Sequence, residues 1–250
     1  MIKVGIIGGS GLDDPQLLKS VKEHRATTPY GDPSSPLIIG SIEGREVVII
    51  SRHGKQHTIP PTHVNFRANI HALQSQGCTH ILATTACGSL REEIKRGDLV
   101  ILDQFIDFTR FRPITYFDIF PAGAENAKHT AMSDPFDESL RQKLIASAEE
   151  LGLSFHKQGT VVTIEGPRFS TRAESRMFRI WGADVVNMSI APEAILANEA
   201  GIPYAAVAIS TDYDCWKTDE APVEWSEVLR IFEKNIERVK GLLLKTIQTI

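Results

Sequence analysis

Residues 204–216, YAAVAISTDYDCW, pass from an apolar stretch directly into hydroxyl and carboxyl side chains. The apolar part, residues 204–210, has the length and composition of a β-strand. Seven further stretches share this form, namely residues 3–7, 37–42, 47–51, 80–85, 99–106, 159–165 and 184–187. We therefore predict eight strands that belong to one sheet system.

Helical patterns alternate with these strands. They cover residues 65–76, residues 138–151, which end at Gly152, and residues 224–246, which carry one apolar stripe. This alternation is typical of an α/β protein in which helices flank a mainly parallel sheet. The sequence contains neither an internal repeat nor a Gly/Ser linker, so we expect one domain spanning residues 1–250.

Residues 110–134 contain Pro113, Pro121 and Gly123 and lack both patterns. A segment of this length without regular structure is uncommon inside a compact domain and is often functional. We expect a long excursion that serves as a substrate lid or as a subunit contact.

The composition excludes several classes of protein. The 250 residues are 42% hydrophobic and 23% charged, and the net charge of −4 is spread along the chain. Nucleic acid polymers and membrane surfaces attract a broad cationic field, so we expect neither as a partner and favour a small polar substrate. The first apolar run is too short for a signal peptide, and no stretch is long enough to span a bilayer. We expect a cytoplasmic protein.

The three cysteines, Cys78, Cys87 and Cys215, are odd in number and far apart, and they form no C-x-x-C pair. They therefore predict neither a disulfide framework nor a zinc site, and we expect no metal. A nucleophilic Cys87 beside Gly88 would need an activating base nearby, so inert buried thiols are favoured.

Residues suited to an anion follow three of the predicted strands. They are the turn Gly8-Gly9-Ser10-Gly11, the pair Arg52 and His53, and the segment from Thr84 to Ser89. Ligands gather at the carboxyl ends of strands in open α/β sheets. The dinucleotide fingerprint and the Walker lysine are both missing, which argues against NAD and ATP. Each motif has a structural alternative, such as a plain turn or a surface ion pair, but together they predict an anion site.

Asp212 and Asp214 lie two positions apart, so in an extended chain they face the same side. Two close carboxylates repel each other, and one of them would then keep its proton and serve as a general acid. The alternative is a solvated loop in which an aspartate caps the next turn. Phe169 offers an aromatic face to a planar base, although core packing explains Phe169 and Met188 equally well. Glu165 could be a hydrogen-bonded carboxylate with a structural task.

Six blocks carry a resemblance to a known family. They are GGSGLDD (8–14), RHGKQHTIPP (52–61), TTACGSLREE (84–93), TIEGPRFSTRAE (163–174), NMSIAPEA (187–194) and STDYDCW (210–216). In order and spacing they resemble the 5′-methylthioadenosine phosphorylases of the trimeric purine nucleoside phosphorylase family. The resemblance implies a nucleoside phosphorylase fold, with a mixed, largely parallel sheet, and a homotrimer. It also implies phosphorolysis of 5′-methylthioadenosine to adenine and 5-methylthioribose 1-phosphate in purine and methionine salvage, with inorganic phosphate as co-substrate and no cofactor.

The same resemblance implies a role for each matching residue. Phosphate would be bound by Ser10, Arg52, His53, Thr85, the Ala86 N–H and Ser189. Phe169 and Met188 would line the nucleoside, while Asp212 and Asp214 would address the purine and catalyse its departure. Specificity would depend on Ser170, on Val228 and Leu229, and on His129, which would complete the site of a neighbouring subunit. Trp225 stands where the family has a small aliphatic residue beside the 5′ substituent.

Three alternatives remain. A phosphorylase with broader 5′ specificity would take adenosine, inosine or methylthioinosine, and Trp225 leaves adenosine open whereas an acceptor at Asp212 disfavours 6-oxo purines. A nucleosidase would use water and would not need Arg52 and His53. A non-catalytic nucleoside-binding module would keep Phe169 and Met188 without needing an acid.

Overall fold

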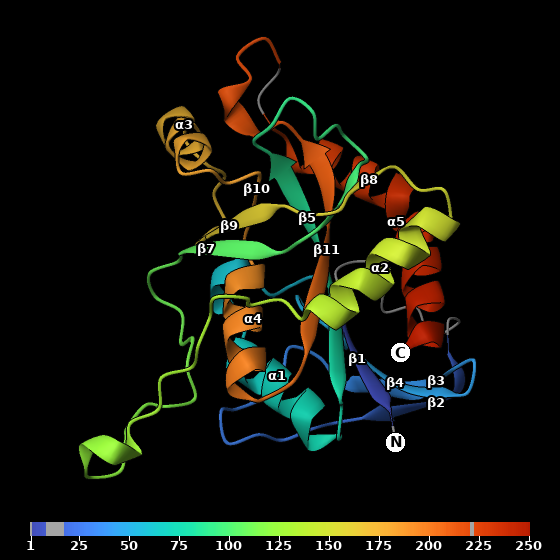
Figure 1. The fold of residues 1–250 in the computed structure, drawn as a ribbon, viewed down its shortest axis with the longest axis vertical. Coiled ribbons are helices and arrows are strands. Elements are labelled where there is room, and N and C mark those ends of the chain that lie inside the picture. The colour runs from blue at the N-terminus through green and yellow to red at the C-terminus, as the bar shows by residue number, and fades with distance from the viewer. Residues whose placement is uncertain (1, 9–17, 221–222) are drawn as a thin grey trace.

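The fold is built on one 11-stranded sheet with helices on both faces (Figure 1). The computed structural model describes residues 2–8, 18–220 and 223–250. The predicted glycine turn with Ser10 lies outside these residues. The strands are β1 (Lys3–Gly8), β2 (Lys19–His24), β3 (Leu37–Ile42), β4 (Arg45–Ser51), β5 (His80–Ser89), β6 (Leu99–Ile101), β7 (Gln104–Phe108), β8 (Phe155–His156), β9 (Thr160–Ile164), β10 (Val185–Asn187) and β11 (Tyr204–Asp212).

The sheet is mixed and largely parallel, which confirms the predicted fold class. Its main path runs β2-β3-β4-β1-β5-β10-β9-β7, and β11 leaves this path to pair with both β5 and β6. The central strands β4, β1, β5 and β11 are parallel to one another, whereas β10 is antiparallel to β5. Strands buried on both faces suit such an arrangement, because their apolar residues meet helices above and below.

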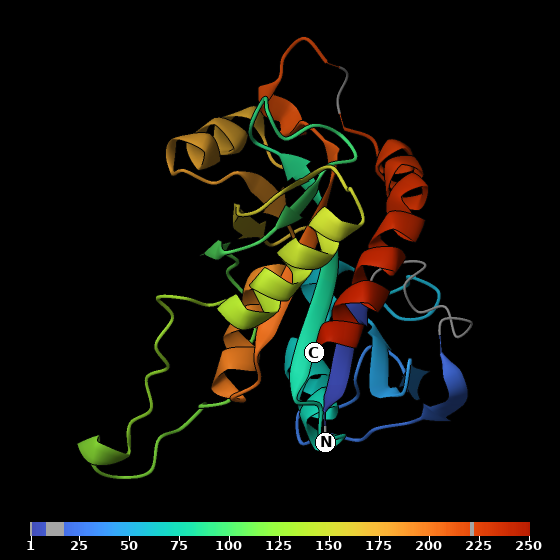
Figure 2. The same cartoon turned by 45° about the vertical axis from the view of Figure 1, so that its right-hand side comes forward.

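Two helical layers enclose the sheet. The helices are α1 (Phe66–Ser75), α2 (Glu138–Glu150), α3 (Arg172–Ile180), α4 (Ile190–Glu199) and α5 (Trp225–Thr249). One core packs α1 and α4 against the sheet, and a second core packs α2 and α5 against the other face (Figures 1 and 2). The side chains that these helices turn toward the sheet are apolar. Burying these side chains fixes the orientation of each helix.

β5 is the strand around which the site forms. One edge of β5 pairs with β11, and the other pairs with β1 as far as Ala83 and with β10 only from Gly88 onward. Between these two partners, residues 84–87 have no ladder partner on that edge among the described strands. The sheet is therefore opened beside β5, and polar groups can enter.

Several details of the predicted elements were wrong, and the two-residue strand β8 was missed as well. β5 continues to Ser89 rather than ending at Thr85, because β11 extends alongside it. The predicted strand 99–106 is two strands, since β6 pairs with β11 and β7 with β9. β2, with the sequence KSVKEH, was missed because an exposed edge strand lacks an apolar face. α3 and α4 were also missed, and α4 lacks a helical period because it is apolar on nearly all sides.

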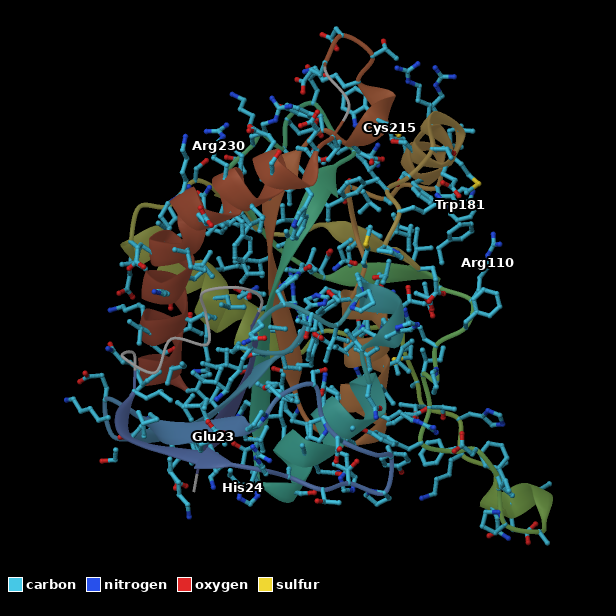
Figure 3. The ribbon with its side chains drawn as sticks, turned by 180° about the vertical axis from the view of Figure 1, so that it is seen from behind. Glu23, His24, Arg110, Trp181, Cys215 and Arg230 are labelled. Carbon is cyan, nitrogen blue, oxygen red and sulfur yellow. The ribbon has the colours of Figure 1, made fainter. Side chains whose placement is uncertain are left out.

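The predicted excursion over residues 110–134 extends away from the body and carries a single helical turn, η3 (Ala124–Asn126), at its tip (Figures 1 and 2). Figure 3 shows Arg110, at its root, close to Trp181 at the end of α3. Both side chains contact Phe108, whose ring centre lies 5.5 Å from the Arg110 guanidinium and 5.6 Å from the Trp181 ring centre. Among the described residues, none of the helices has the length and apolarity that crossing a membrane requires.

Candidate active site

A cavity of about 640 Å³ lies beside the open edge of β5. Its wall is formed by β5, β9, β10, β11, the turn that follows β4 and the first turns of α5. Thirteen of the residues singled out in the sequence line it, namely Arg52, His53, Thr85, Ala86, Phe169, Ser170, Met188, Ser189, Asp212, Asp214, Trp225, Val228 and Leu229. The structure thus brings together side chains that are spread over most of the sequence.

Arg52 is buried at one end of this cavity, and its guanidinium is already paired. Nε and Nη2 donate to the two carboxylate oxygens of Glu193 (2.5 and 2.9 Å), and Nη1 donates to the Thr84 carbonyl (2.8 Å). Burial opposes the charge, but the negative Glu193 raises the pKa of Arg52 above its ordinary value. Glu193 thus occupies the Nε–Nη2 side of the guanidinium. One N–H on each Nη atom remains for a ligand.

Glu193 was missed in the sequence. It lies in the first turn of α4, is fully buried, and also accepts a hydrogen bond from the Tyr204 hydroxyl (2.8 Å). The available signal was a carboxylate inside the otherwise apolar segment IAPEAILA, because such a group needs a buried partner. The pair leaves this end of the cavity close to neutral before a ligand binds.

Neutral donors surround Arg52. Ser189 is the N-cap of α4, yet its hydroxyl makes no capping bond and lies 3.4 Å from the Thr85 hydroxyl. A helix N-terminus attracts anions through its free N–H groups and its dipole. Asn187 donates to Thr85 (3.2 Å) and accepts from Thr163 (2.8 Å), which orients this group of hydroxyls.

The Ala86 N–H belongs to the same end of the cavity. Ile81 donates its N–H toward β11, to the Pro203 carbonyl (2.8 Å). Alternate residues of a strand turn their N–H groups to opposite edges, so the N–H of Ala86 faces the open edge of β5. The Thr84 carbonyl, which Arg52 contacts, lies on that edge as well. Arg52, Thr85, Ala86 and Ser189 thus form an anion-binding end.

His53 lines the anion-binding end, in a defined tautomer. Its Nδ1 lies 2.9 Å from the carbonyl oxygen of Ile59. A carbonyl oxygen can only accept, so Nδ1 carries a proton. Burial, followed by the positive charge of Arg52, lowers the pKa of His53 to about 4. At neutral pH the ring is neutral, and its other nitrogen, Nε2, is an acceptor.

Asp212 and Asp214 lie at the opposite end. Both carboxyl groups line the cavity, as expected, but the premise of an extended chain was wrong, because Asp214 belongs to a helical turn, η4 (Asp214–Trp216), and has a φ of 46°. Instead, the Asp214 N–H donates to Asp212 Oδ1 (2.8 Å). Burial raises the pKa of Asp212 to about 6, and the charge of Asp214 is a smaller cause. The predicted proton retention thus has desolvation, rather than repulsion, as its main origin.

Thr211 can pair with either protonation state of Asp212. Its hydroxyl oxygen lies 2.8 Å from Asp212 Oδ2 and 3.1 Å from the carbonyl oxygen of Cys87. The hydroxyl has one hydrogen, so it serves only one of these acceptors at a time. When it donates to Cys87, a protonated Asp212 can donate to Thr211. The hydrogen-bond network therefore accommodates both protonation states of Asp212.

Gly88 lets β5 pass directly beneath the carboxyl pair. A Cβ at this position would lie 2.9 Å from Asp212 Oδ1 and 3.3 Å from the Cβ of Asp214. The neighbouring Cys87 is buried, and that burial raises the pKa of its thiol well above the ordinary value. Cys87 therefore packs beneath the site as an inert thiol, as favoured from the sequence.

The wall between the two ends is apolar. Ile164, Met188, Val186 and Phe169 belong to this wall, with Val186 and Phe169 toward the carboxyl pair. α5 contributes Val228, Leu229, Phe232 and, at the mouth, Trp225. Trp225 is half exposed. The ring of His57, which sequence reasoning missed, has its centre 4.6 Å from that of His53 and 5.6 Å from that of Trp225. An aromatic row thus runs from the anion-binding end to the mouth.

Arg112 holds Met188 from behind and was also missed. Its guanidinium donates to the carbonyls of Met188 (2.6 Å) and Glu165 (2.6 Å), and to Glu165 Oε1 (3.1 Å). Glu165 Oε2 accepts in turn from the Arg110 N–H (2.6 Å). Glu165 therefore has the structural task considered as an alternative in the sequence, and it joins the root of the excursion to the cavity wall.

His129 lies outside this cavity. It is exposed on the excursion, where its ring packs edge-on against Phe120 with centres 5.7 Å apart. Ser10 lies in the segment that the structure does not describe.

Comparisons with known proteins agree with this geometry. Residues 3–248 match the phosphorylase superfamily. The S-methyl-5′-thioadenosine phosphorylases of Xenopus tropicalis and Danio rerio are 54% and 52% identical to this chain, over all of it and 89% of each relative. A methylthioadenosine phosphorylase from Schistosoma mansoni in complex with adenine superposes with a TM-score of 0.92 at 44% identity, covering 100% of this chain and 92% of that one. A mutant adenosine/methylthioadenosine phosphorylase from the same organism, in complex with methylthioadenosine, gives a TM-score of 0.91 at 44% identity, with coverage of 100% and 91%.

Proposed function

Because this chain belongs to the phosphorylase superfamily, we propose that it cleaves 5′-methylthioadenosine with inorganic phosphate, releasing adenine and 5-methylthioribose 1-phosphate. The observation that carries the proposal is the polarity of one cavity, which has an anion-binding end, an apolar middle and a buried carboxyl pair at the far end. Bound phosphate, ribose and purine would follow one another along the cavity in this same order. The reaction serves purine and methionine salvage.

The anion-binding end holds phosphate beneath the sugar. As the bond from ribose C1′ to the purine N9 stretches, the sugar gains positive charge and the base gains negative charge. Arg52, the Ala86 N–H and the hydroxyls of Thr85 and Ser189 fix the phosphate where it stabilises the sugar cation and then bonds to C1′. Because Glu193 balances the charge of Arg52, Arg52 acts mainly by orienting the phosphate and adds little net positive charge.

The carboxyl end receives the purine. Asp212, protonated in part near neutral pH, donates to N7 of the departing base, and a carboxylate oxygen of the pair accepts from the 6-amino group. Ser170 and Phe169 border this end, where Phe169 offers its face to the base. A carboxylate acceptor favours adenine over 6-oxo purines, which present an acceptor at the same position.

Adenosine is a second candidate substrate. The mouth formed by Trp225, Val228 and Leu229 is apolar, which favours a methylthio group over a 5′-hydroxyl. Trp225 is half exposed, however, and a polar 5′ group beside it keeps contact with water. The related S. mansoni protein is named after both substrates, as an adenosine/methylthioadenosine phosphorylase.

We further propose a homotrimer. The excursion and its root expose large apolar side chains, Phe111 at 82% and Ile119 at 88%, on a segment that projects from the body. Exposed apolar residues of this kind favour burial against another subunit. His129 would then reach the mouth of a neighbouring cavity.

A substrate panel with and without phosphate tests the function. We expect adenine release from methylthioadenosine to require phosphate, adenosine to react more slowly, and inosine and methylthioinosine to react least. Equal adenine release without phosphate would identify a nucleosidase. Binding of nucleosides without turnover would identify a binding module.

A further inference from the structure

His53 presents a lone pair, rather than an N–H donor, to a bound anion. Its proton is held on Nδ1 by the Ile59 carbonyl, so the polar atom left for a ligand is Nε2, which carries a lone pair. A lone pair repels a bare anionic oxygen. It attracts an oxygen that still bears hydrogen.

We propose that His53 selects phosphate over fully deprotonated oxyanions by accepting, at Nε2, a hydrogen bond from the hydroxyl group of the bound phosphate. The inference rests on the phosphorolysis proposed above and specifies which anion the site takes and how it is oriented. Phosphate and arsenate keep a hydroxyl throughout the neutral range, whereas sulfate has none. The hydroxyl faces His53, and the bare oxygens face Arg52, Thr85, Ala86 and Ser189.

The surroundings of His53 keep its ring neutral. The charged or titratable groups that act on it are Arg52 at the end of β4, His57 in the same turn, and Arg112 at the root of the excursion. All three oppose a positive charge on His53, and burial opposes it further. Glu193, the carboxylate that contacts Arg52, is bound to it through both oxygens.

The geometry argues against the opposite tautomer. Moving the proton to Nε2 would leave the Nδ1 lone pair against the Ile59 carbonyl oxygen at 2.9 Å, where two acceptors would face each other. The backbone of this turn is fixed, because the Ile59 N–H donates to the His53 carbonyl (3.0 Å). Ring and turn therefore hold each other in one arrangement.

Competition between anions tests this selection. In methylthioadenosine phosphorolysis at about pH 8, we expect sulfate to inhibit with a constant about ten- to a hundredfold above the KM for phosphate, because it leaves a buried acceptor unpaired. Arsenate, which shares the hydroxyl, should replace phosphate within a few-fold. The sulfate disadvantage should persist to about pH 5 and shrink as the pH falls through about 4, the pKa of His53, where protonation turns Nε2 into a donor.

His53→Gln is the diagnostic variant, because the glutamine amide can donate to any oxyanion. We expect it to reduce the discrimination against sulfate at least about tenfold, whereas His57→Gln, which removes the adjacent ring, should preserve the discrimination. If His53→Gln proves inactive, calorimetric titration of the free protein with phosphate and with sulfate gives the same ratio without turnover.

Two failures are distinguishable. Phosphorolysis with sulfate binding as well as arsenate at every pH would overturn the selection by His53 and leave the function intact. Absence of phosphate binding or of phosphate-dependent adenine release would overturn the proposed function itself.

Discussion

Asp212 is a carboxyl group whose surroundings suit both of its protonation states. Thr211 can turn its hydroxyl toward Asp212 or toward the Cys87 carbonyl, and burial brings the pKa of Asp212 to about 6. A general acid is most effective when its pKa lies near the working pH. The proton on this residue is therefore available for transfer to a purine nitrogen.

Asp212→Asn removes the transferable proton and keeps the shape of the side chain. We expect turnover of methylthioadenosine to fall by about a hundredfold or more, in the range that general acid catalysis contributes. Activity on 6-oxo nucleosides should be spared or should rise, because the new amide can donate to a 6-oxo group. Steady-state kinetics on methylthioadenosine and inosine measure both effects, and unchanged kinetics with methylthioadenosine would refute the proposed role.

The same variant should change how stability depends on pH. The pKa of Asp212 is higher in the folded protein than in an unfolded chain, so its contribution to stability is greatest below about pH 4 and falls as the pH rises through about 6. Asparagine lacks this penalty. We compare the free energy of unfolding of Asp212→Asn with that of wild type at each pH. This difference should favour the variant by about 1–3 kcal/mol more at pH 7.5 than at pH 4. Urea unfolding in phosphate-free buffer measures the gain, and a difference independent of pH would contradict it.

Gly88→Ala should damage the purine end and spare the anion-binding end. Its Cβ would come within 2.9 Å of Asp212 Oδ1 and 3.2 Å of a Val186 methyl, so the carboxyl pair must shift. We expect the KM for methylthioadenosine to rise about tenfold, the KM for phosphate to change little, and stability to fall by about 1–3 kcal/mol. Gly241→Ala is the control, because an added Cβ there has no neighbour within 4 Å. Equal changes in both KM values would show a general disruption instead.

At the scale of elements, α4 organises the anion-binding end. Its N-cap Ser189 presents a hydroxyl, and one turn later Glu193 holds Arg52 from β4. Removing one partner of a buried ion pair leaves the other charge uncompensated, which costs more than the pair itself contributes. The helix thus positions Arg52 and also balances its charge.

Glu193→Gln should make the folded protein depend on phosphate. Without phosphate, we expect the free energy of unfolding to drop by about 3–5 kcal/mol, because Arg52 becomes a buried unpaired charge. Bound phosphate supplies a new negative partner, so its stabilising effect should be larger in the variant than in the wild type. Thermal unfolding in phosphate and in chloride measures this difference. Glu237→Gln, which changes an exposed carboxylate on α5, should show neither effect. Equal phosphate stabilisation of wild type and Glu193→Gln would contradict the idea that Glu193 and phosphate share Arg52.

The elements that sequence reasoning found are those with a clear period or apolar run, such as β1, β4, β11 and α5. α4 was missed because a helix buried on nearly all sides loses its period, and β2 because an edge strand needs no apolar face. Among the residues that line the cavity, Arg52, His53 and Thr85 were found from their place at strand ends. The family resemblance added the Ala86 N–H, Ser170, Ser189, Val228 and Leu229. Residues that act through another residue, Glu193 and Arg112, were not, because their partners lie 141 and 53 positions away.

At the scale of the whole molecule, the excursion connects the cavity with the surface. Its root is held by Glu165 and Arg112, and Arg112 also fixes the Met188 carbonyl. Its tip, η3, lies away from the body, and His129 follows η3 three residues later. A subunit that packs against the excursion would therefore touch the same segment that supports the nucleoside wall. Assembly and substrate binding are expected to favour each other through this segment.

Mixed oligomers test whether His129 serves a neighbouring cavity. We expect His129→Ala alone to raise the KM for methylthioadenosine several-fold, and Asp212→Asn alone to have little turnover. When both chains are produced in the same cells, some cavities combine an intact Asp212 with an intact His129 from the adjacent subunit. The mixture should then contain an active component with the wild-type KM, which neither variant shows alone. If His129 acted within its own chain, or if the protein were monomeric, every active cavity in the mixture would lack His129 and the raised KM would persist.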